Sequence, residues 1–199
     1  MNVLVLNSSS RTKESVSRQL VGLMLDKLRA ENPVARVIER NLSKALPLID
    51  EEWVEANFTK KQALNDRQKQ VLAFSDALIT ELDQADILVF GVPLYNFSVP
   101  ASLKLWIDLV CRAGVTFRYL SGGNVEGLLQ NKQAFVMMTS GGVPLGSVED
   151  HATPLMRDVL GLIGIEQVNF ISVSGVPKNT ERGMAEARVK IDELFQSHA

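Results

Sequence analysis

NVLVLNSSSRTKESVS, residues 2–17, decides the fold, because it joins an apolar strand to a serine-rich turn and the start of a helix. Residues 3–6 are all Val or Leu without polar alternation, which is typical of a strand buried on both faces of a parallel sheet. Apolar residues then recur at helical spacing between Ser15 and about Ala30, namely Val16, Leu20, Met24 and Leu28. The segment therefore predicts the first strand, loop and helix of an α/β domain.

The same alternation of strands and helices continues along the chain. Apolar runs predict further strands at 35–38, 87–92, 134–138 and 168–173, and helical spacing predicts helices at 64–82, 101–112, 153–163 and 180–196. Residues 115–127 predict a hairpin-like insertion, whereas 46–61 shows no sustained period and predicts an irregular excursion. Five strands alternating with helices imply one α/β domain over residues 1–199, with a parallel sheet covered by helices on both faces.

Composition narrows the setting and the partners. The net charge is -2, from 21 basic and 23 acidic residues spread along the chain, so neither nucleic acid nor a membrane is an expected partner. Cys111 is the single cysteine, and neither a signal peptide nor a run of 18 apolar residues is present, so a cytoplasmic protein is expected. The two histidines, His151 and His198, are far apart and lack a cysteine cluster, so no metal site is expected.

The first loop has the composition of an anion site. Ligands of open parallel sheets bind outside the carboxyl ends of the strands, which directs attention to residues 7–17, 93–97 and 139–146. Residues 7–17 place hydroxyls and backbone N–H groups at the start of a helix, where an anion is favoured; the alternative is that these serines only form turns and caps. The turn lacks the GxGxxG pattern, and GxxxxGK[ST] occurs nowhere, so one phosphate fits better than a pyrophosphate.

The other two loops could hold a flat ring. Leu94, Tyr95, Asn96 and Phe97 lie between two prolines and offer aromatic faces and an amide, although a proline turn with aromatics in the core is the alternative. Thr139, Ser140, Gly141 and Gly142 follow the fourth strand, and paired glycines allow close approach of a ligand to the backbone. Taken alone, the glycine pair is an ordinary turn. As the third loop at one sheet edge, it favours a shared crevice.

Four segments together resemble a known family: SSSRTKESVS, GVPLYNFSVPASLKLWIDLVCRAGVTFRY, TSGG and TPLMRDVLGLIGI. They are similar to the FMN-dependent NADH azoreductases and quinone reductases, and the resemblance covers nearly the whole chain. It implies a flavodoxin-like fold with strand order 2-1-3-4-5 and a homodimer with FMN near the subunit interface. It also implies ping-pong reduction of quinones or azo compounds by NADH or NADPH, without a required catalytic side chain.

The resemblance also implies residue roles. Ser9, Ser15, Val16 and Ser17 would hold the FMN phosphate; Leu94, Tyr95, Asn96 and Phe97 would line the isoalloxazine ring; and Thr139, Ser140, Gly141 and Gly142 would touch its pyrimidine side. Tyr119 matches a position near the substrate. Two departures concern the acceptor: Ser140 stands where relatives commonly carry arginine, and Leu162 where some carry an aromatic residue.

Two other functions remain open at this point. A serine hydrolase could use Ser9 or Ser140 with His151 and Asp150, although the chain has no GxSxG motif. A flavodoxin-type electron carrier would share the phosphate loop but expose the flavin edge to protein partners. The near-neutral composition and the long Tyr95-to-Tyr119 stretch favour a substrate pocket over the carrier.

Overall fold

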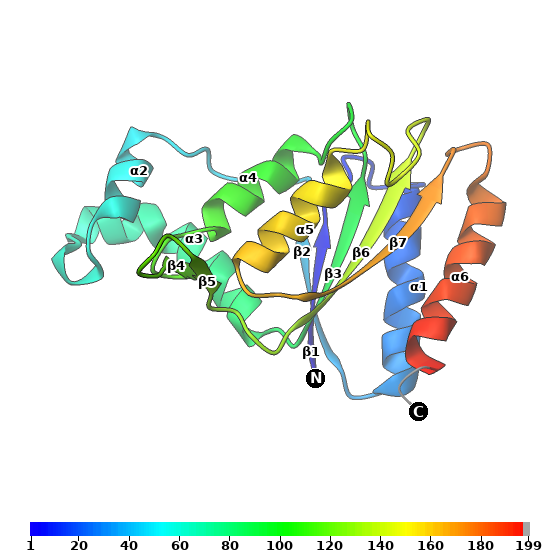
Figure 1. Cartoon of the computed structure of the whole chain (residues 1–199), viewed down its shortest axis with the longest axis horizontal. Helices are drawn as coiled ribbons and strands as arrows, with labels where there is room; N and C mark the ends of the chain where they lie inside the picture. The colour runs from blue at the N-terminus through cyan, green and yellow to red at the C-terminus, as the bar shows by residue number, and fades with distance from the viewer. Residues whose placement is uncertain (197–199) are drawn as a thin grey trace.

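Five parallel strands form the central sheet of the computed structural model, which describes residues 1–196 (Figure 1). Their order is β2-β1-β3-β6-β7, so the predicted order 2-1-3-4-5 is confirmed once the sheet strands alone are numbered. The strands are β1 (Asn2–Asn7), β2 (Arg36–Asn41), β3 (Ile87–Pro93), β6 (Gln133–Ser140) and β7 (Gln167–Ser174). His198, considered above as a metal ligand, lies outside the described residues.

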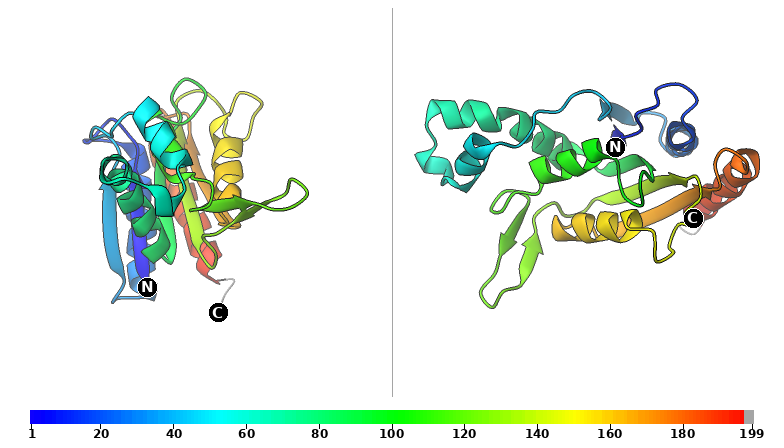
Figure 2. Two further views of the ribbon diagram at one scale, coloured as in Figure 1. Left: turned by 90° about the vertical axis from the view of Figure 1, so that its left-hand side faces the viewer. Right: turned by 90° about the horizontal axis from the view of Figure 1, so that it is seen from above.

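Helices cover both faces of the sheet, as the sequence predicts. One face carries α1 (Val16–Glu31) and α6 (Thr180–Gln196); the other carries α3 (Asp66–Gln84), α4 (Ala101–Val110) and α5 (Ala152–Leu162) (Figures 1 and 2). The alternating residues of β1 explain its unbroken apolar run. Val3 and Val5 pack with α1 and α6, whereas Leu4 and Leu6 pack with the other helices. Each strand residue therefore has a core to enter, whichever way it points.

The stretch 46–61 is more regular than expected. It contains α2 (Glu51–Phe58), and η1 (Lys61–Ala63) follows. The Asp50 side chain caps α2 by accepting from the Trp53 backbone N–H at 2.9 Å, and α2 packs against α3 through Trp53 and Ala56. The prediction of an irregular excursion was wrong because a helix this short buries only two residues, which is too few to show a period.

The predicted insertion is a small antiparallel hairpin. Its strands are β4 (Phe117–Tyr119) and β5 (Val125–Gly127), and Gly122 and Gly123 form the turn with positive φ. The Arg118 guanidinium donates to the Glu126 carboxylate across the two strands at 2.5 Å. The hairpin stands away from the central sheet, beside the end of α5 (Figure 2).

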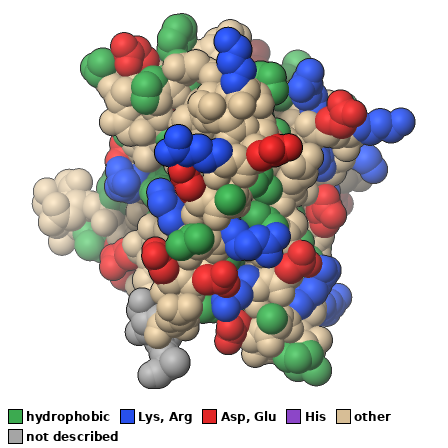
Figure 3. Space-filling model, turned by 90° about the vertical axis from the view of Figure 1, so that its right-hand side faces the viewer, with side chains coloured by type: hydrophobic (Ala, Val, Ile, Leu, Met, Phe, Trp, Pro, Cys, Tyr) green, Lys and Arg blue, Asp and Glu red, His purple; other side chains and the backbone are tan. Residues whose placement is uncertain are grey.

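The surface agrees with the near-neutral composition. On the face that includes α6, basic and acidic side chains are interspersed rather than gathered by sign (Figure 3). Within residues 1–196, no helix combines the length and apolarity needed to cross a membrane. No group of three potential metal ligands occurs in the same range.

Candidate functional site

The three loops singled out from the sequence meet in one pocket of about 240 Å³ at the carboxyl ends of β1, β3 and β6. Adjacent strand order brings them together, because β3 lies between β1 and β6. The Leu94 N–H donates to the Thr139 carbonyl at 2.7 Å, and the Ser9 and Tyr95 hydroxyls are 3.5 Å apart. The lining residues are Ser9, Arg11, Glu14, Ser15, Val16, Ser17, Pro93, Leu94, Tyr95, Thr139, Ser140, Gly141 and Val176.

The start of α1 is arranged for an anion. Ser15 occupies the N-cap position, but its hydroxyl caps no backbone N–H and lies 3.1 Å from the Ser17 hydroxyl. The first turn contains no acidic residue, and both serines are buried. The first-turn N–H groups and the two hydroxyls therefore face a pocket where negative charge is favoured by the helix dipole. This is the geometry that a phosphate monoester requires.

Arg18 holds the first loop, residues 7–17, in place through its guanidinium. Its guanidinium donates to the Ser9 carbonyl at 3.1 Å, to the Arg11 carbonyl at 3.0 Å and to the Asn41 side chain at 2.8 Å. One side chain thus holds two loop residues and the end of β2. The sequence analysis missed Arg18, because nothing in a helix pattern shows which loop carbonyls its guanidinium will reach.

Gly91 lets β3 approach the same loop closely. A Cβ built on Gly91 would lie 2.8 Å from Asn7 Oδ1 and 3.0 Å from a Val21 methyl group. The Ser8 hydroxyl donates to the Gly91 carbonyl at 2.8 Å. The sequence analysis missed this residue also, although a glycine inside a bulky apolar strand is a signal for close backbone approach.

The loop of residues 94–97, which is predicted to hold the flavin ring and is called the ring loop below, is a tight turn with unusual backbone angles. Tyr95 and Ser98 exchange two backbone hydrogen bonds, at 2.9 and 3.0 Å, around Asn96 (φ 47°) and Phe97 (φ 72°). Two central residues with positive φ are the mark of a type I′ hairpin turn, which asparagine tolerates and phenylalanine rarely adopts. Phe97 is 53% exposed. Backbone strain of this kind clusters at functional sites.

Asn96 and Phe97 do not line the small pocket. Asn96 lines a neighbouring cavity of about 640 Å³, which shares Tyr95 with the first and also includes Ser10 and Lys44. The Phe97 carbonyl accepts from the His151 N–H at 2.9 Å, which ties the ring loop to the start of α5. These two predicted ring contacts therefore lie at the rim, beside the pocket.

The third loop offers backbone rather than side chains. The Ser140 hydroxyl donates to the Val143 carbonyl within its own loop, and the Ser140 carbonyl accepts from the Val176 N–H at 3.0 Å. Gly141 lines the pocket, whereas Gly142 does not. Ser140 lines the pocket too, and its hydroxyl is bonded within its own loop.

Asp150 and His151 are not arranged for the serine hydrolase alternative. Burial alone would raise the pKa of Asp150, but the Thr153 hydroxyl and the N–H groups of Gly146, Thr153 and Ala152 donate to this carboxylate and lower its pKa below the usual value. These bonds stabilise the loop and the start of α5, and His151 is exposed without a bond to Asp150 within residues 1–196. Among the residues that the structure describes, His151 forms no Ser-His-Asp arrangement.

Cys111 is not a nucleophile either. It packs against the apolar core, and burial raises the pKa of its thiol to about 12. The reactive thiolate is therefore scarce near neutral pH.

Tyr119 and Leu162 lie away from the pocket within one chain. Tyr119 is at the end of β4 and is 70% exposed; Leu162 ends α5 and is half-buried. Neither lines the pocket at the strand ends. The elements that carry them are nevertheless neighbours, because the β4–β5 hairpin packs against α5.

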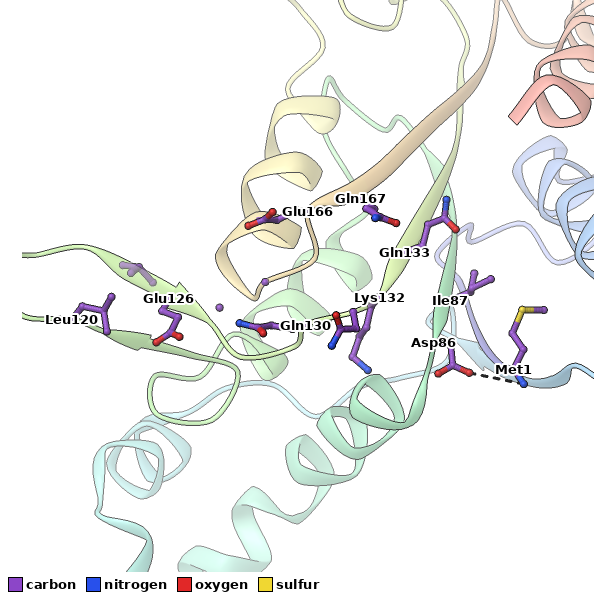
Figure 4. Close-up of a pocket in the computed structure, with 15 residues that line it drawn as sticks. Met1, Asp86, Ile87, Leu120, Glu126, Gln130, Lys132, Gln133, Glu166 and Gln167 are labelled. Carbon is purple, nitrogen blue, oxygen red and sulfur yellow. Dashed lines mark ion pairs between the residues drawn. The ribbon is translucent and has the colours of Figure 1, made fainter. Parts of the chain in front are cut away.

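A larger cavity, about 940 Å³, opens at the amino ends of the strands (Figure 4). Two of its charged groups are already bonded within the protein. The Lys132 ammonium donates to the Asp83 and Ala85 carbonyls at 2.7 Å each, and Asp86 accepts from the Asn2 N–H at 2.7 Å. Volume alone therefore does not identify the site; the smaller pocket is distinguished by the start of α1, where an anion is favoured.

Comparison with known proteins agrees with this fold. A family model described as flavodoxin-like fold matches residues 1–195. A relative from Hahella chejuensis named FMN-dependent NADH:quinone oxidoreductase 1 is 46% identical over 189 residues, covering 95% of this chain and 92% of that protein. A Jannaschia relative of the same name is 42% identical over 193 residues, covering 97% and 98%.

Solved structures support the fold independently. An azoreductase from Bacillus anthracis superposes with a TM-score of 0.86 at 24% identity, covering 98% of both chains. An FMN-dependent NADH-azoreductase from the same species, solved in complex with FMN, gives a TM-score of 0.82 at 21% identity, covering 97% and 98%. The chain belongs to the flavodoxin-like fold family and, within it, to the family of the FMN-dependent NADH:quinone oxidoreductases.

Proposed function

We propose that the protein is an FMN-dependent oxidoreductase that transfers reducing equivalents from NADH or NADPH to quinones, and also to azo compounds. The observation that carries this proposal is the uncapped start of α1, where buried Ser15 and Ser17 line a pocket at the helix N-terminus, the position that favours a phosphate group. The names of the 46% and 42% identical relatives supply the donor and the acceptor class.

The residues present fit FMN. Ser9, Ser15, Val16 and Ser17 would hold its phosphate, and no pyrophosphate-binding glycine turn is needed. Leu94 and Tyr95 would border the ring on one side. Thr139, Ser140 and Gly141 would border it on the other, through backbone groups, because the Ser140 hydroxyl already donates to the Val143 carbonyl.

The chemistry that FMN supplies when bound is two-electron transfer between a nicotinamide and an acceptor. The protein's task is to orient each substrate in turn against the ring. Asn96 and Phe97, at the exposed rim, are placed to contact these substrates. A quinone also takes up protons, and solvent at the rim or the Tyr119 hydroxyl would donate them, so no fixed general acid is required.

We propose that the protein acts in the cytoplasm as a homodimer with FMN near the subunit interface. Tyr119 and Leu162 do not line the pocket of their own chain, so a substrate-side role requires that they face the pocket of a second copy. The hairpin and its flank expose the apolar side chains of Tyr119, Leu120, Val125 and Leu128, which a second copy would cover.

Anaerobic titration of the FMN-loaded protein tests the proposal. NADH should bleach the flavin absorbance, and a benzoquinone should restore it with one equivalent of quinone consumed per FMN. A protein that binds no FMN would contradict the proposal. One that binds FMN but is reduced only by a partner protein would be an electron carrier instead. Sedimentation equilibrium tests the homodimer separately.

A further inference from the structure

The β4–β5 hairpin is fixed to the end of α5 by a contact between two glycine backbones. A Cβ built on Gly127 would lie 2.0 Å from the Gly164 nitrogen, 2.3 Å from the Gly164 Cα and 2.4 Å from the Ile163 carbonyl carbon. Beside this contact, the Leu129 N–H donates to the Ile163 carbonyl at 2.9 Å. No side chain larger than hydrogen fits at Gly127 without a shift of one backbone or the other.

The other end of the hairpin is fixed to the end of α4 by hydrogen bonds of Thr116. The buried Thr116 hydroxyl donates to the Val110 carbonyl at 2.7 Å and accepts from the Arg112 N–H at 3.0 Å, at the end of α4. The Leu128 N–H donates to the Thr116 carbonyl at 2.9 Å, which links the two ends. The hairpin is therefore an arm held at its base by α4 and α5.

The two predicted substrate-side residues both belong to this unit. Tyr119 ends β4 of the arm, and Leu162 lies next to Ile163, whose carbonyl accepts from Leu129. Figure 4 shows the arm, with Leu120 and Glu126, beside the turn that leads from α5 to Glu166. Any shift at the glycine contact changes the separation between Tyr119 and Leu162, because the contact lies between their elements.

We infer that Gly127 is a positioning residue for the acceptor: through its contact with Gly164 it sets where Tyr119 stands relative to Leu162. Gly127 itself borders the cavity at the amino ends of the strands and not the pocket at the carboxyl ends, so it acts through the arm. This inference rests on the proposed function, which supplies the acceptor.

Gly127→Ala is the test, and Gly161→Ala is its matched control. Gly161 lies in α5 three residues before Gly164, and a Cβ there would meet nothing within 4 Å. Because displacements near 1 Å cost up to about a hundredfold in rate, we expect kcat/KM for a bulky naphthoquinone to fall by about tenfold to a hundredfold in Gly127→Ala. FMN affinity and the control should match the wild type.

Two further readouts separate positioning from a loss of folded protein. The ratio of kcat/KM for benzoquinone to that for the naphthoquinone should change, whereas fewer folded molecules would lower both values equally. Hydrogen exchange of residues 117–129 should quicken in Gly127→Ala while residues 133–140 stay protected. Wild-type kcat/KM for both quinones in a folded, FMN-loaded Gly127→Ala protein would overturn the inference.

The inference can still be tested if Gly127→Ala does not fold or if the wild type reduces no quinone. If Gly127→Ala does not fold, Thr116→Val loosens the other end of the arm and should lower kcat/KM for the naphthoquinone more than for benzoquinone; an unchanged ratio would overturn the inference. If the wild type reduces no quinone, the proposed function fails. Hydrogen exchange then still decides whether Gly127 fixes the arm, since that measurement needs no activity.

Discussion

The two edges of the sheet differ in the helix ends that border their cavities. At the amino edge, a cavity of about 940 Å³ borders the end of α3, where the Lys132 ammonium donates to the Asp83 and Ala85 carbonyls. At the carboxyl edge, a pocket of about 240 Å³ faces the uncapped start of α1. The smaller space faces a helix N-terminus, which favours an anion, whereas the larger one borders a helix C-terminus, whose carbonyls hold a cation. An anion site is therefore recognised by the helix end that it faces, and cavity size is a poor guide to it.

The two edges also differ in which non-glycine residues adopt positive φ. Glu14, Asn96 and Phe97 adopt positive φ at the carboxyl edge. The amino edge has Asn131, a residue type that tolerates this conformation. Holding Glu14 and Phe97 in such angles costs stability, and the surrounding loops maintain them.

The largest expected effect comes from placing a negative charge at each edge. Ser15→Asp puts a carboxylate where the phosphate would bind, and like-charge repulsion should weaken FMN binding by about a hundredfold. Aspartate is also a good N-cap, so the FMN-free variant should melt no lower than the wild type. Asn131→Asp adds the same charge at the amino-edge cavity and should leave FMN affinity unchanged. Fluorescence titration with FMN measures both, and equal affinities would remove the distinction between the edges.

A crowding substitution tests how closely β3 must approach the phosphate loop. Gly91→Ala places a Cβ 2.8 Å from Asn7 Oδ1, so we expect a loss of about 1–3 kcal/mol in the free energy of unfolding. Gly22→Ala is the control, because a Cβ there meets nothing within 4 Å. Urea denaturation of both variants gives the difference. Equal stabilities would show that the loop can move without cost.

The pH dependence of stability tests the loop before α5. The pKa of Asp150 is lowered in the folded protein, so its contribution is fully present above the usual value of 3.8 and is lost as pH falls through the folded pKa. Asp150→Asn should cost about 1–2 kcal/mol near neutral pH. The gap to the wild type should close below about pH 4. Glu149→Gln, at an exposed neighbour, is the control; a gap that persists in acid would contradict the assignment.

The smallest effect concerns strain in the ring loop. Without FMN, Phe97→Gly should be more stable than Phe97→Ala by about 1 kcal/mol, because only glycine adopts φ near 72° freely. Both variants remove the exposed Phe97 ring, so under the proposed function both should lose quinone reduction alike. Urea denaturation compares their stabilities. A more stable alanine variant would show that the turn is not strained.

The sequence predicts the sheet well and the connections less well. The β1 run is conclusive because Val3, Leu4, Val5 and Leu6 enter cores on both faces. By contrast, α2 escapes notice because its stability depends on one cap and on Trp53 packing against α3.

The same limit applies to the candidate site. Three loops could be assigned to one edge from the parallel order alone. Arg18 and Gly91 could not, because their roles depend on carbonyls and side chains that only the tertiary fold brings near. The roles of Tyr119 and Leu162 remain predictions, since neither residue lines the pocket of its own chain.

The uncapped start of α1 has a consequence for the amount of protein in the cell. A ligand that binds only the folded state at a hundred times its Kd stabilises that state by about 2.7 kcal/mol. Newly made chains that meet FMN would therefore persist, while those made during flavin shortage would unfold more often and be degraded. Through two serine hydroxyls and one helix end, vitamin supply would regulate the lifetime of the protein as well as its activity.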